Sequence, residues 1–499
     1  MGKTRLLIFS QILVAVLLCP GHSAAGDCDY DFEVFGEWRY IYSHAQDFPL
    51  NVDGDVSGLN WYLDHRLDIG TRQYIGDFFE FDLEFEVFYG QVAGDFDHLA
   101  AEFRQDTRQT LRGWDLAEFD LRQAWVRLDL PWFQVRLGHM YSNWGLGLLA
   151  NDGRSTPGRF GYQDKGDISE RVILATRPLF MVDNWASDIV LALGAGVVYH
   201  DENCDLRNGD VGIELIGSIF YHDDGLDFGM YVAGRMQEDD AGTRLDATAV
   251  DFFGKIDAGP GFEGLLLAAE FAILTGSTDR VIQADRLEGL DISAFGAAFR
   301  GGWRFGFFDF LPVLELGYAS GDADPHDNTI TSFSFDPDYK VGLVLFDTVM
   351  RHVTAMGAKE SADPDRIGQP LPGTDQLASK GRVSGAFYLY PSVSMRPLPE
   401  MTVMAGFLFA FSAVPFSQSF RTFENGGVPT NPYGLENPGR YLGWELNLGV
   451  DWDQKIWQGL HVVGGFQAGW FFPGSAFDRP DGTRPGIVSR FLARVALTY

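Results

Sequence analysis

Hydrophobic and polar residues alternate with a period of two in many short segments of this chain. In the clearest segment, 79–90, apolar residues occupy the odd positions, and four carboxylates followed by Phe88 and Gly90 occupy the even positions. Side chains alternate between the two faces of a β-strand, whereas at 3.6 residues per turn the same aromatic residues would surround a helix axis. The segment therefore predicts a strand with one apolar and one charged face.

The C-terminal segment has the same pattern. Leu497 and Tyr499 fall on one face, while Arg490 and Arg494 fall on the other. This arrangement resembles the last strand of bacterial outer-membrane barrels. We expect it to pair with the first strand, 30–42, because an open sheet edge in hydrocarbon would leave backbone groups without hydrogen bonds.

Segments of similar pattern recur along the chain, each near the 9 to 11 residues that a tilted membrane strand needs. They predict an all-β fold, a transmembrane antiparallel up-and-down β-barrel of about 18 strands. The predicted strands lie near 30–42, 59–72, 79–90, 121–130, 133–138, 168–177, 189–199, 211–222, 226–237, 247–258, 265–276, 290–304, 308–319, 383–396, 401–412, 442–453, 462–472 and 487–499.

The connections between these segments alternate in length. Tight connections fall at every second junction, namely 74–77, 131–132, 223–225, 259–261, 305–306 and 397–400. Long connections rich in Gly, Pro and Asp lie between them, namely 93–115, 141–167, 320–380 and 413–439. Short periplasmic turns and long extracellular loops are typical of outer-membrane barrels. We therefore expect a single barrel domain over 26–499, with 320–380 as a long extracellular loop.

The longest loop contains a helical pattern. Val341, Leu345, Val349 and Val353 recur at helical spacing within 340–355. The pattern has two interpretations. The helix either folds into the mouth of the barrel as a constriction or packs on its rim, and the sequence leaves open whether the loop plugs the pore.

The N-terminal residues 1–25 have the three regions of a secretory signal peptide. Lys3 and Arg5 precede an apolar run from Leu6 to Leu18, and small residues end at Ala25. The apolar run is shorter than the roughly 20 residues of a spanning helix. Export of this kind is consistent with a protein of a Gram-negative outer membrane.

Composition narrows the classes of partner. The net charge is −31, and it becomes −33 once Lys3 and Arg5 leave with the signal, so we expect no nucleic-acid partner. The 42 Phe, 18 Tyr and 12 Trp residues suit the aromatic girdles of a membrane interface. Cys28 and Cys204 remain after signal removal, and they either form a disulfide or stay as two unrelated thiols, the reading we favour.

The face assignment predicts which charged side chains line the lumen. Burying this many carboxylates without water or counter-charges would cost too much free energy. The interior must therefore hold water, counter-charges or both. Closure of the barrel would place Arg490 and Arg494 beside Glu33 and Glu37. An acidic wall facing a basic wall would sort solutes by charge, while ion-pair ladders between strands are the alternative. The predicted lining residues are Glu33, Glu37, Arg39, Asp64, Arg66, Asp68, Glu80, Asp82, Glu84, Glu86, Arg490 and Arg494.

Motifs for catalysis or cofactor binding are scarce. Gly145-Leu-Gly-Leu-Leu-Ala150 matches a dinucleotide fingerprint in form, but no crossover helix unit surrounds it. The carboxylates of 321–328 suit either calcium or an ordinary polar turn. We therefore predict neither an enzyme, nor a catalytic residue, nor a cofactor, nor a bound metal.

Three segments resemble the alginate-export type of outer-membrane barrel. They are Leu121-Arg-Gln-Ala-Trp-Val-Arg-Leu-Asp-Leu130, Val135-Arg-Leu-Gly-His139 and Gly317-Tyr-Ala-Ser-Gly-Asp-Ala-Asp-Pro325. The resemblance implies an outer-membrane conduit, in the founding case for an anionic polysaccharide. This chain departs from that family at 138–140, where Gly138, His139 and Met140 replace Gly-Arg-Gln, and on its more acidic inward face.

These observations favour a porin-like channel that passes solutes or a polysaccharide passively across the outer membrane. Its expected partners are outer-membrane lipid, the transported solute or polysaccharide, and periplasmic export components. Two alternatives remain, a membrane-embedded scaffold or sheath for another envelope component and a hydrolase active at the rim. The sequence specifies neither the substrate, nor the direction of transport, nor the oligomeric state.

Overall fold

The computed structural model describes residues 30–95, 99, 119–154, 159–162, 166–257, 263–280, 289–324, 327–369 and 373–499. The predicted signal peptide 1–25, Cys28 and most of the predicted loop 93–115 lie outside the described residues.

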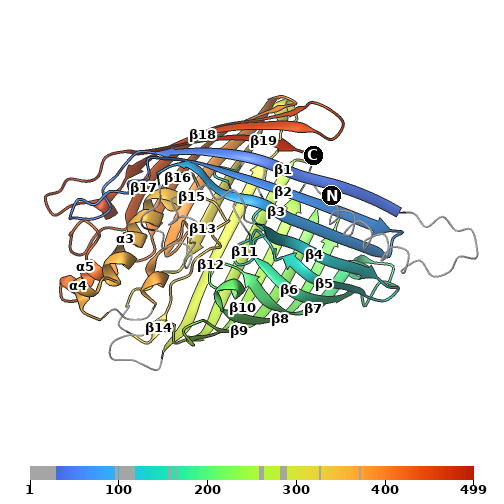
Figure 1. Ribbon diagram of the computed structural model, residues 1–499, viewed down its shortest axis with the longest axis horizontal. Coiled ribbons are helices and arrows are strands. Elements are labelled where there is room, and N and C mark those ends of the chain that lie inside the picture. The colour runs from blue at the N-terminus through green and yellow to red at the C-terminus, as the bar shows by residue number, and fades with distance from the viewer. Residues whose placement is uncertain are drawn as a thin grey trace, which may run out of the picture.

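Eighteen antiparallel strands form a closed barrel, as the sequence predicts (Figure 1). The short β14 (Thr329–Ile330) is an addition that pairs in parallel with β12. The barrel strands are β1 (Tyr30–Ala45), β2 (Trp61–Ile75), β3 (Phe79–Gly94), β4 (Asp120–Asp129), β5 (Gln134–Tyr141), β6 (Ile168–Thr176), β7 (Ile189–His200), β8 (Val211–Asp223), β9 (Leu226–Glu238), β10 (Arg244–Asp257), β11 (Leu265–Thr278), β12 (Leu290–Trp303), β13 (Leu311–Ala319), β15 (Ala386–Leu398), β16 (Met401–Ser412), β17 (Tyr441–Lys455), β18 (His461–Pro473) and β19 (Val488–Thr498).

The first and last barrel strands close the sheet. β1 pairs with β19 from Glu37 opposite Thr498 to Ala45 opposite Arg490. The N–H and C=O groups of Gly36 and Tyr499 exchange hydrogen bonds of 3.0 and 2.9 Å. Closure satisfies the backbone groups of both edge strands, which hydrocarbon could not do.

The register of this closure corrects one expectation. Arg490 lies opposite Ala45 rather than beside Glu33, because the start of β1 extends beyond the end of β19. Glu33 instead faces Arg72 in the register of β1 with β2. The expected neighbours Glu37 and Arg494 do meet, at 2.6 Å.

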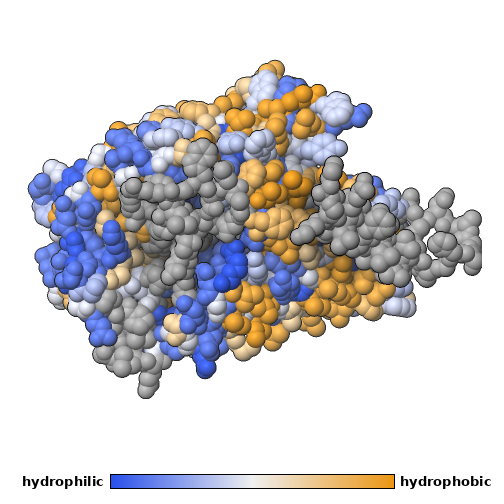
Figure 2. All heavy atoms as spheres, in the orientation of Figure 1, coloured by the Kyte–Doolittle hydropathy of each residue, from blue (hydrophilic) through white to orange (hydrophobic). Residues whose placement is uncertain are grey.

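The outer face of the barrel is apolar around its turn end and polar at its loop end (Figure 2). Along β8, four outward residues at odd positions are 43–56% exposed, namely Val211, Ile213, Leu215 and Ile219. Exposed aromatic residues mark the turn end, as expected of an interfacial girdle. They are Trp132, Trp185, Phe307, Phe308 and Trp457.

One turn is longer than the sequence predicted. The expected turn at 305–306 extends to Phe310, so β13 starts at Leu311 instead of 308. Phe308 and Asp309 have φ values of 52° and 48°, which a strand does not allow, and they belong to the 3₁₀ turn η3 (Phe307–Asp309). The connection between β6 and β7 lies where the predicted strands place it and contains η1 (Trp185–Asp188).

A bulge in β3 reverses one predicted face. Leu67 lies opposite Phe88, while the next residue, Asp68, lies opposite Glu86, so Val87 is an extra residue in the pairing. A single inserted residue moves the following side chains to the other face. Phe88 consequently points outward, with its ring centroid 6.5 Å from that of Trp38.

Helices gather at the loop end of the barrel (Figure 1). The helical pattern predicted within 340–355 appears as a π-helix, η4 (Leu345–Met350), which continues into α3 (Arg351–Ser361). In the described part of the chain, no helix is both long enough and apolar enough to cross a bilayer. The remaining short elements are η2 (Leu206–Asn208), α4 (Pro364–Ile367), η5 (Thr374–Leu377), α5 (Ser419–Glu424) and η6 (Ser475–Phe477).

The outer face generates a prediction about depth in the membrane. Leu215→Arg should lower the free energy of unfolding by about 2–4 kcal/mol, because it places a cation on the lipid face near mid-depth. Val211→Arg, on the same face of β8 but at its loop end, should cost only about 0–1 kcal/mol. Denaturant titration in lipid vesicles measures both, and equal costs would contradict the assigned orientation of β8.

Candidate functional site

Ion pairs run along the inner wall from β2 to β4. The guanidinium of Arg66 lies 2.8 Å from Asp68 and 3.0 Å from Glu86. Arg72 lies 2.7 Å from Asp82 and 3.5 Å from Glu80. Glu86 and Asp82 are almost fully buried, and each lies close to a cation, which burial of a carboxylate requires.

This ladder continues on both sides of the same wall. Arg127 binds Glu80 at 2.6 Å, and Gln123 donates to Glu84 at 2.7 Å. Towards the closure, Glu37 contacts Arg494 at 2.6 Å and Arg39 at 3.6 Å. Cations and carboxylates therefore alternate on one wall, as in the ion-pair alternative, and do not form an acidic wall facing a basic one.

Two predicted residues have different surroundings. Glu33 is exposed near the start of β1, beyond the region where β1 pairs with β19. Asp64 is partly buried on β2 and lies opposite Gln91.

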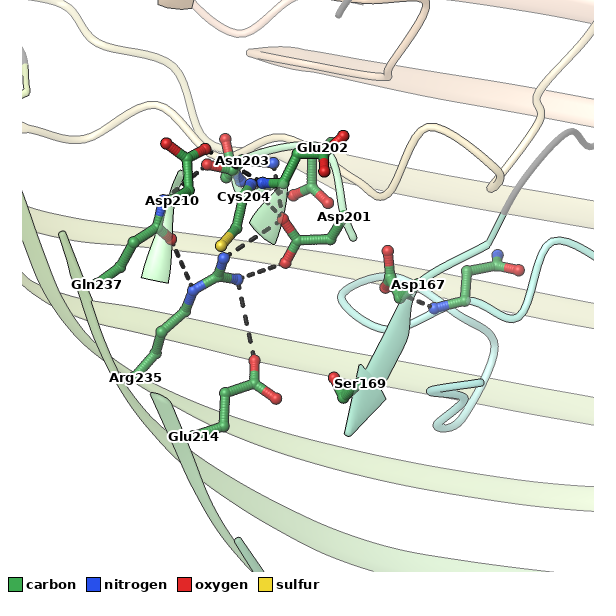
Figure 3. Close-up of polar contacts among 12 residues, drawn as sticks. Asp167, Ser169, Asp201, Glu202, Asn203, Cys204, Asp210, Glu214, Arg235 and Gln237 are labelled. Carbon is green, nitrogen blue, oxygen red and sulfur yellow. Dashed lines mark hydrogen bonds and ion pairs between the residues drawn. The ribbon is translucent and has the colours of Figure 1, made fainter. Parts of the chain in front are cut away.

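A second set of ion pairs joins β6 to β9, and Arg235 is the member of it that the sequence predicts as an inward charge. Arg171 binds Glu214 at 2.9 Å. Arg235 binds Asp201 at 2.5 Å and approaches Glu214 at 3.9 Å (Figure 3). Period-two alternation places Arg171, Glu214 and Arg235 on inward positions, so the signal was present in the sequence.

The predicted loop 320–380 folds against the inner wall through one glutamate. Glu445, fully buried on β17, accepts hydrogen bonds from the backbone N–H groups of Leu343, Val344 and Leu345, at 2.6, 2.9 and 2.7 Å. These donors lie at the start of the helical run of η4 and α3, where unpaired N–H groups attract an anion. We call 333–361 the inner segment.

A second anchor of the inner segment comes from the last strand. Arg490 on β19 binds the carboxylate of Asp347 and donates to the carbonyl of Leu343 at 3.1 Å. Lys340 lies 2.8 Å from the same carboxylate. Burial acts to raise the pKa of Asp347, but Lys340 and Arg490 together lower it to about 2. Asp347 therefore stays ionised at neutral pH.

A third anchor joins two loops to the wall at β13. Glu315 accepts hydrogen bonds from the hydroxyls of Tyr339 and Tyr388, at 2.9 and 2.8 Å. Arg159, from the loop before β6, binds its other oxygen at 2.9 Å. One buried carboxylate thus fixes the inner segment and a second loop together.

The glycine-rich segment 143–153 is held in a comparable way. Glu270 on β11 accepts hydrogen bonds from the N–H groups of Leu146 and Leu148. A Cβ atom at Gly145 would lie 2.4 Å from a carboxylate oxygen of Glu270, and the φ of Gly145 is +59°. Close approach to Glu270 thus explains this glycine, and the segment shows a loop anchor in place of a dinucleotide site.

The inner wall has two chemically different sectors. From β11 to β19 it carries small or apolar side chains, including Ala272, Ala298 and Leu408, which pack with the inner segment in one hydrophobic cluster, and among them stand the buried anchors Glu270, Glu315, Glu445 and Arg490. From β1 to β9 it carries the ion pairs described above. The inner segment therefore packs on the apolar sector of the wall.

Two further predictions concern loop residues, namely the carboxylates of 321–328 and Cys204. Asp322 and Asp327 accept hydrogen bonds from the N–H groups of Asp324 and Thr329, as ordinary turn residues do. Cys204 is buried and forms no disulfide with any described residue, and burial raises the pKa of its thiol to about 12. Its pairing with Cys28 stays untested.

Comparison with known proteins supports the fold. Neither a family model nor a curated protein matches the sequence. Among solved structures, *Acinetobacter baumannii* OccAB1 is 8% identical over 95% of this chain and 98% of its own, with a TM-score of 0.51. *Pseudomonas aeruginosa* OccK2 (OpdF) is 12% identical over 94% and 97%, with a TM-score of 0.48.

A third solved structure, *Pseudomonas aeruginosa* OprD, is 12% identical over 94% of this chain and 95% of its own, with a TM-score of 0.48. The shared architecture with OccAB1 is that of an outer-membrane β-barrel. Together with the apolar outer face and its aromatic girdle, this architecture places the chain in the outer membrane.

The glutamate anchor generates a prediction. Glu445→Gln should speed hydrogen exchange at the amides of Leu343, Val344 and Leu345 by about tenfold or more, because hydrogen bonds to a charged acceptor contribute roughly 1.5–3 kcal/mol. Mass spectrometry of proteolytic peptides measures this exchange. Asp453→Asn, at an exposed position on the same strand, should leave it unchanged. Equal exchange in both variants would show that Glu445 does not anchor the segment.

Proposed function

We propose that the chain is a passive channel of the outer membrane, and that solutes pass along the charged sector of its lumen. The observation that carries this proposal is the division of the inner wall. The inner segment packs on β11 to β19, where the charged groups anchor loops, whereas most ion pairs between neighbouring strands lie on β1 to β9. An 18-stranded barrel encloses more space than its own wall side chains fill.

Residual exposure of the charged wall supports an aqueous path beside it. The side chains of Arg72 and Arg127 are 29% and 34% exposed, and that of Glu37 is 25% exposed. Ion pairs that keep contact with water avoid much of the desolvation cost of a dry interior. Alternating cations and carboxylates along such a path would favour small polar or charged solutes.

We infer that the inner segment is the constriction, the first of the two interpretations of its helix. It is anchored to the wall through Glu445, Arg490 and Glu315, so it narrows the lumen from one side. This narrowing favours small solutes over the polysaccharide that the alginate-export resemblance implies. The same packing is compatible with the scaffold alternative, in which the loops close the lumen completely.

Ion selectivity tests the channel. In planar bilayers the purified protein should show steady conductance, and Glu84→Gln combined with Glu86→Gln should lower its cation-to-anion permeability ratio by about twofold or more, since Arg66 loses a counter-charge. Glu400→Gln, in the turn between β15 and β16, is the control and should leave the ratio unchanged. An unaltered ratio in the double variant would contradict a path along this wall.

Shortening the inner segment tests the constriction. Replacing 340–361 by a short Gly-Ser linker should raise single-channel conductance about twofold or more, because the lumen would lose its main obstruction. Retained heat-modifiable migration in gels would show that the barrel still closes. A folded variant with wild-type conductance would contradict the constriction, and absence of conductance from both proteins would favour the scaffold.

A further inference from the structure

Three carboxylates from three different loops meet inside the loop end of the barrel. Asp167 precedes β6, Glu202 follows β7, and Asp336 belongs to the inner segment. One oxygen of each lies within 4.8 Å of the others. Figure 3 shows Asp167 close to the loop that carries Asp201 and Glu202.

Asp336 is the most buried carboxylate of this group, and its surroundings favour a bound cation. Its side chain is 3% exposed, and its Oδ1 atom accepts the N–H of Asp338 at 2.7 Å. Among the described residues, its Oδ2 atom accepts no hydrogen bond from outside this group, and within the group its carboxyl contacts that of Asp167. An unpaired oxygen of a buried carboxylate is costly, so a cation at this point would stabilise the folded chain.

Three described cations lie near the group. Arg235 is engaged by Asp201 at 2.5 Å. Arg382 approaches Glu202 only at 3.9 Å, and Lys380 donates to the backbone carbonyl of Glu202 at 2.8 Å. Arg235 thus pairs with Asp201, and Arg382 stands 3.9 Å from Glu202, so neither arginine makes a short ion pair with the three carboxylates.

We propose that Asp167, Glu202 and Asp336 bind a divalent cation, and that this cation is Ca²⁺. All the potential ligand atoms are carboxylate oxygens. Ca²⁺ and Mg²⁺ bind oxygen ligands, whereas zinc sites usually include nitrogen or sulfur ligands. Ligands that come from three separate loops suit the large and adaptable coordination sphere of Ca²⁺ better than the compact octahedron of Mg²⁺.

The cation would hold together the loops that carry its ligands. Asp336 donates its N–H to the carbonyl of Leu148 at 2.8 Å, and Asp167 donates its N–H to the carbonyl of Asn151 at 2.8 Å. Binding at the carboxylates therefore fixes the glycine-rich segment 143–153 and the inner segment in one arrangement. This site does not depend on whether the lumen conducts.

Calorimetry of the full-length protein tests the site. Protein folded in a detergent free of lipopolysaccharide and stripped with EGTA should bind one equivalent of Ca²⁺, and its melting temperature should rise with CaCl₂. Asp336→Asn should weaken binding at least about tenfold, since each 1.4 kcal/mol of lost binding energy is tenfold in affinity. Asp365→Asn, an exposed acid in the same predicted loop, should bind like the wild type.

A second readout separates a cation site from a purely structural role. Without Ca²⁺, Asp336→Asn should melt at or above the wild-type temperature, because it removes a buried uncompensated charge, and it should gain no stability from CaCl₂. Glu202→Gln provides the same test if Asp336→Asn does not fold. The proposal is overturned if the stripped wild type shows no saturable binding, if it prefers Mg²⁺, or if the cluster variants bind Ca²⁺ as the wild type does.

Discussion

A carboxylate on the inner wall of this barrel needs a cation or a hydrogen-bond donor, because leaving it unpaired away from bulk water costs several kcal/mol. The chain meets this constraint in two ways. On β2 to β4 the partners are arginines of neighbouring strands, such as Arg66 and Arg72. On β11 and β17 the partners are backbone N–H groups of loops, which Glu270 and Glu445 bring against the wall.

The kind of partner determines whether a sector of the wall carries ion pairs or binds a loop. Arginine partners lie within the wall itself, so they draw no segment of chain inward, and in the proposed channel the sector that they neutralise is the aqueous path. Backbone partners belong to loops, so each glutamate of this kind draws a segment of chain inward. Small wall residues such as Ala272 and Ala298 then leave room for the apolar side chains of that segment. The two-sided lumen thus follows from how its inward charges are compensated.

The strands and their order were predictable from the sequence, because period-two alternation is strong where one face meets lipid and the other meets charge. The register of strand pairing and the positions of the bulges were not predictable from the sequence. The extra residue at Val87 changes no composition, yet it moves Phe88 to the outer face. The offset of β1 against β19 likewise separates Arg490 from Glu33. Both depend on pairing between distant segments, which periodicity within one segment does not encode.

The anchors of the inner segment were hidden for a different reason. In the sequence, Glu445 is one more inward acid on a strand, equivalent to Glu84 or Glu86. Only the fold shows that its cross-strand neighbours, Leu408 and Phe471, are apolar instead of basic. Only the fold shows, too, that its hydrogen-bond partners come from about a hundred residues earlier in the chain. Because the wall is closed by its own backbone hydrogen bonds, we expect the barrel to tolerate changes in the inner segment. The surroundings of each inward glutamate therefore determine the shape of the lumen, while the strand pattern determines the barrel.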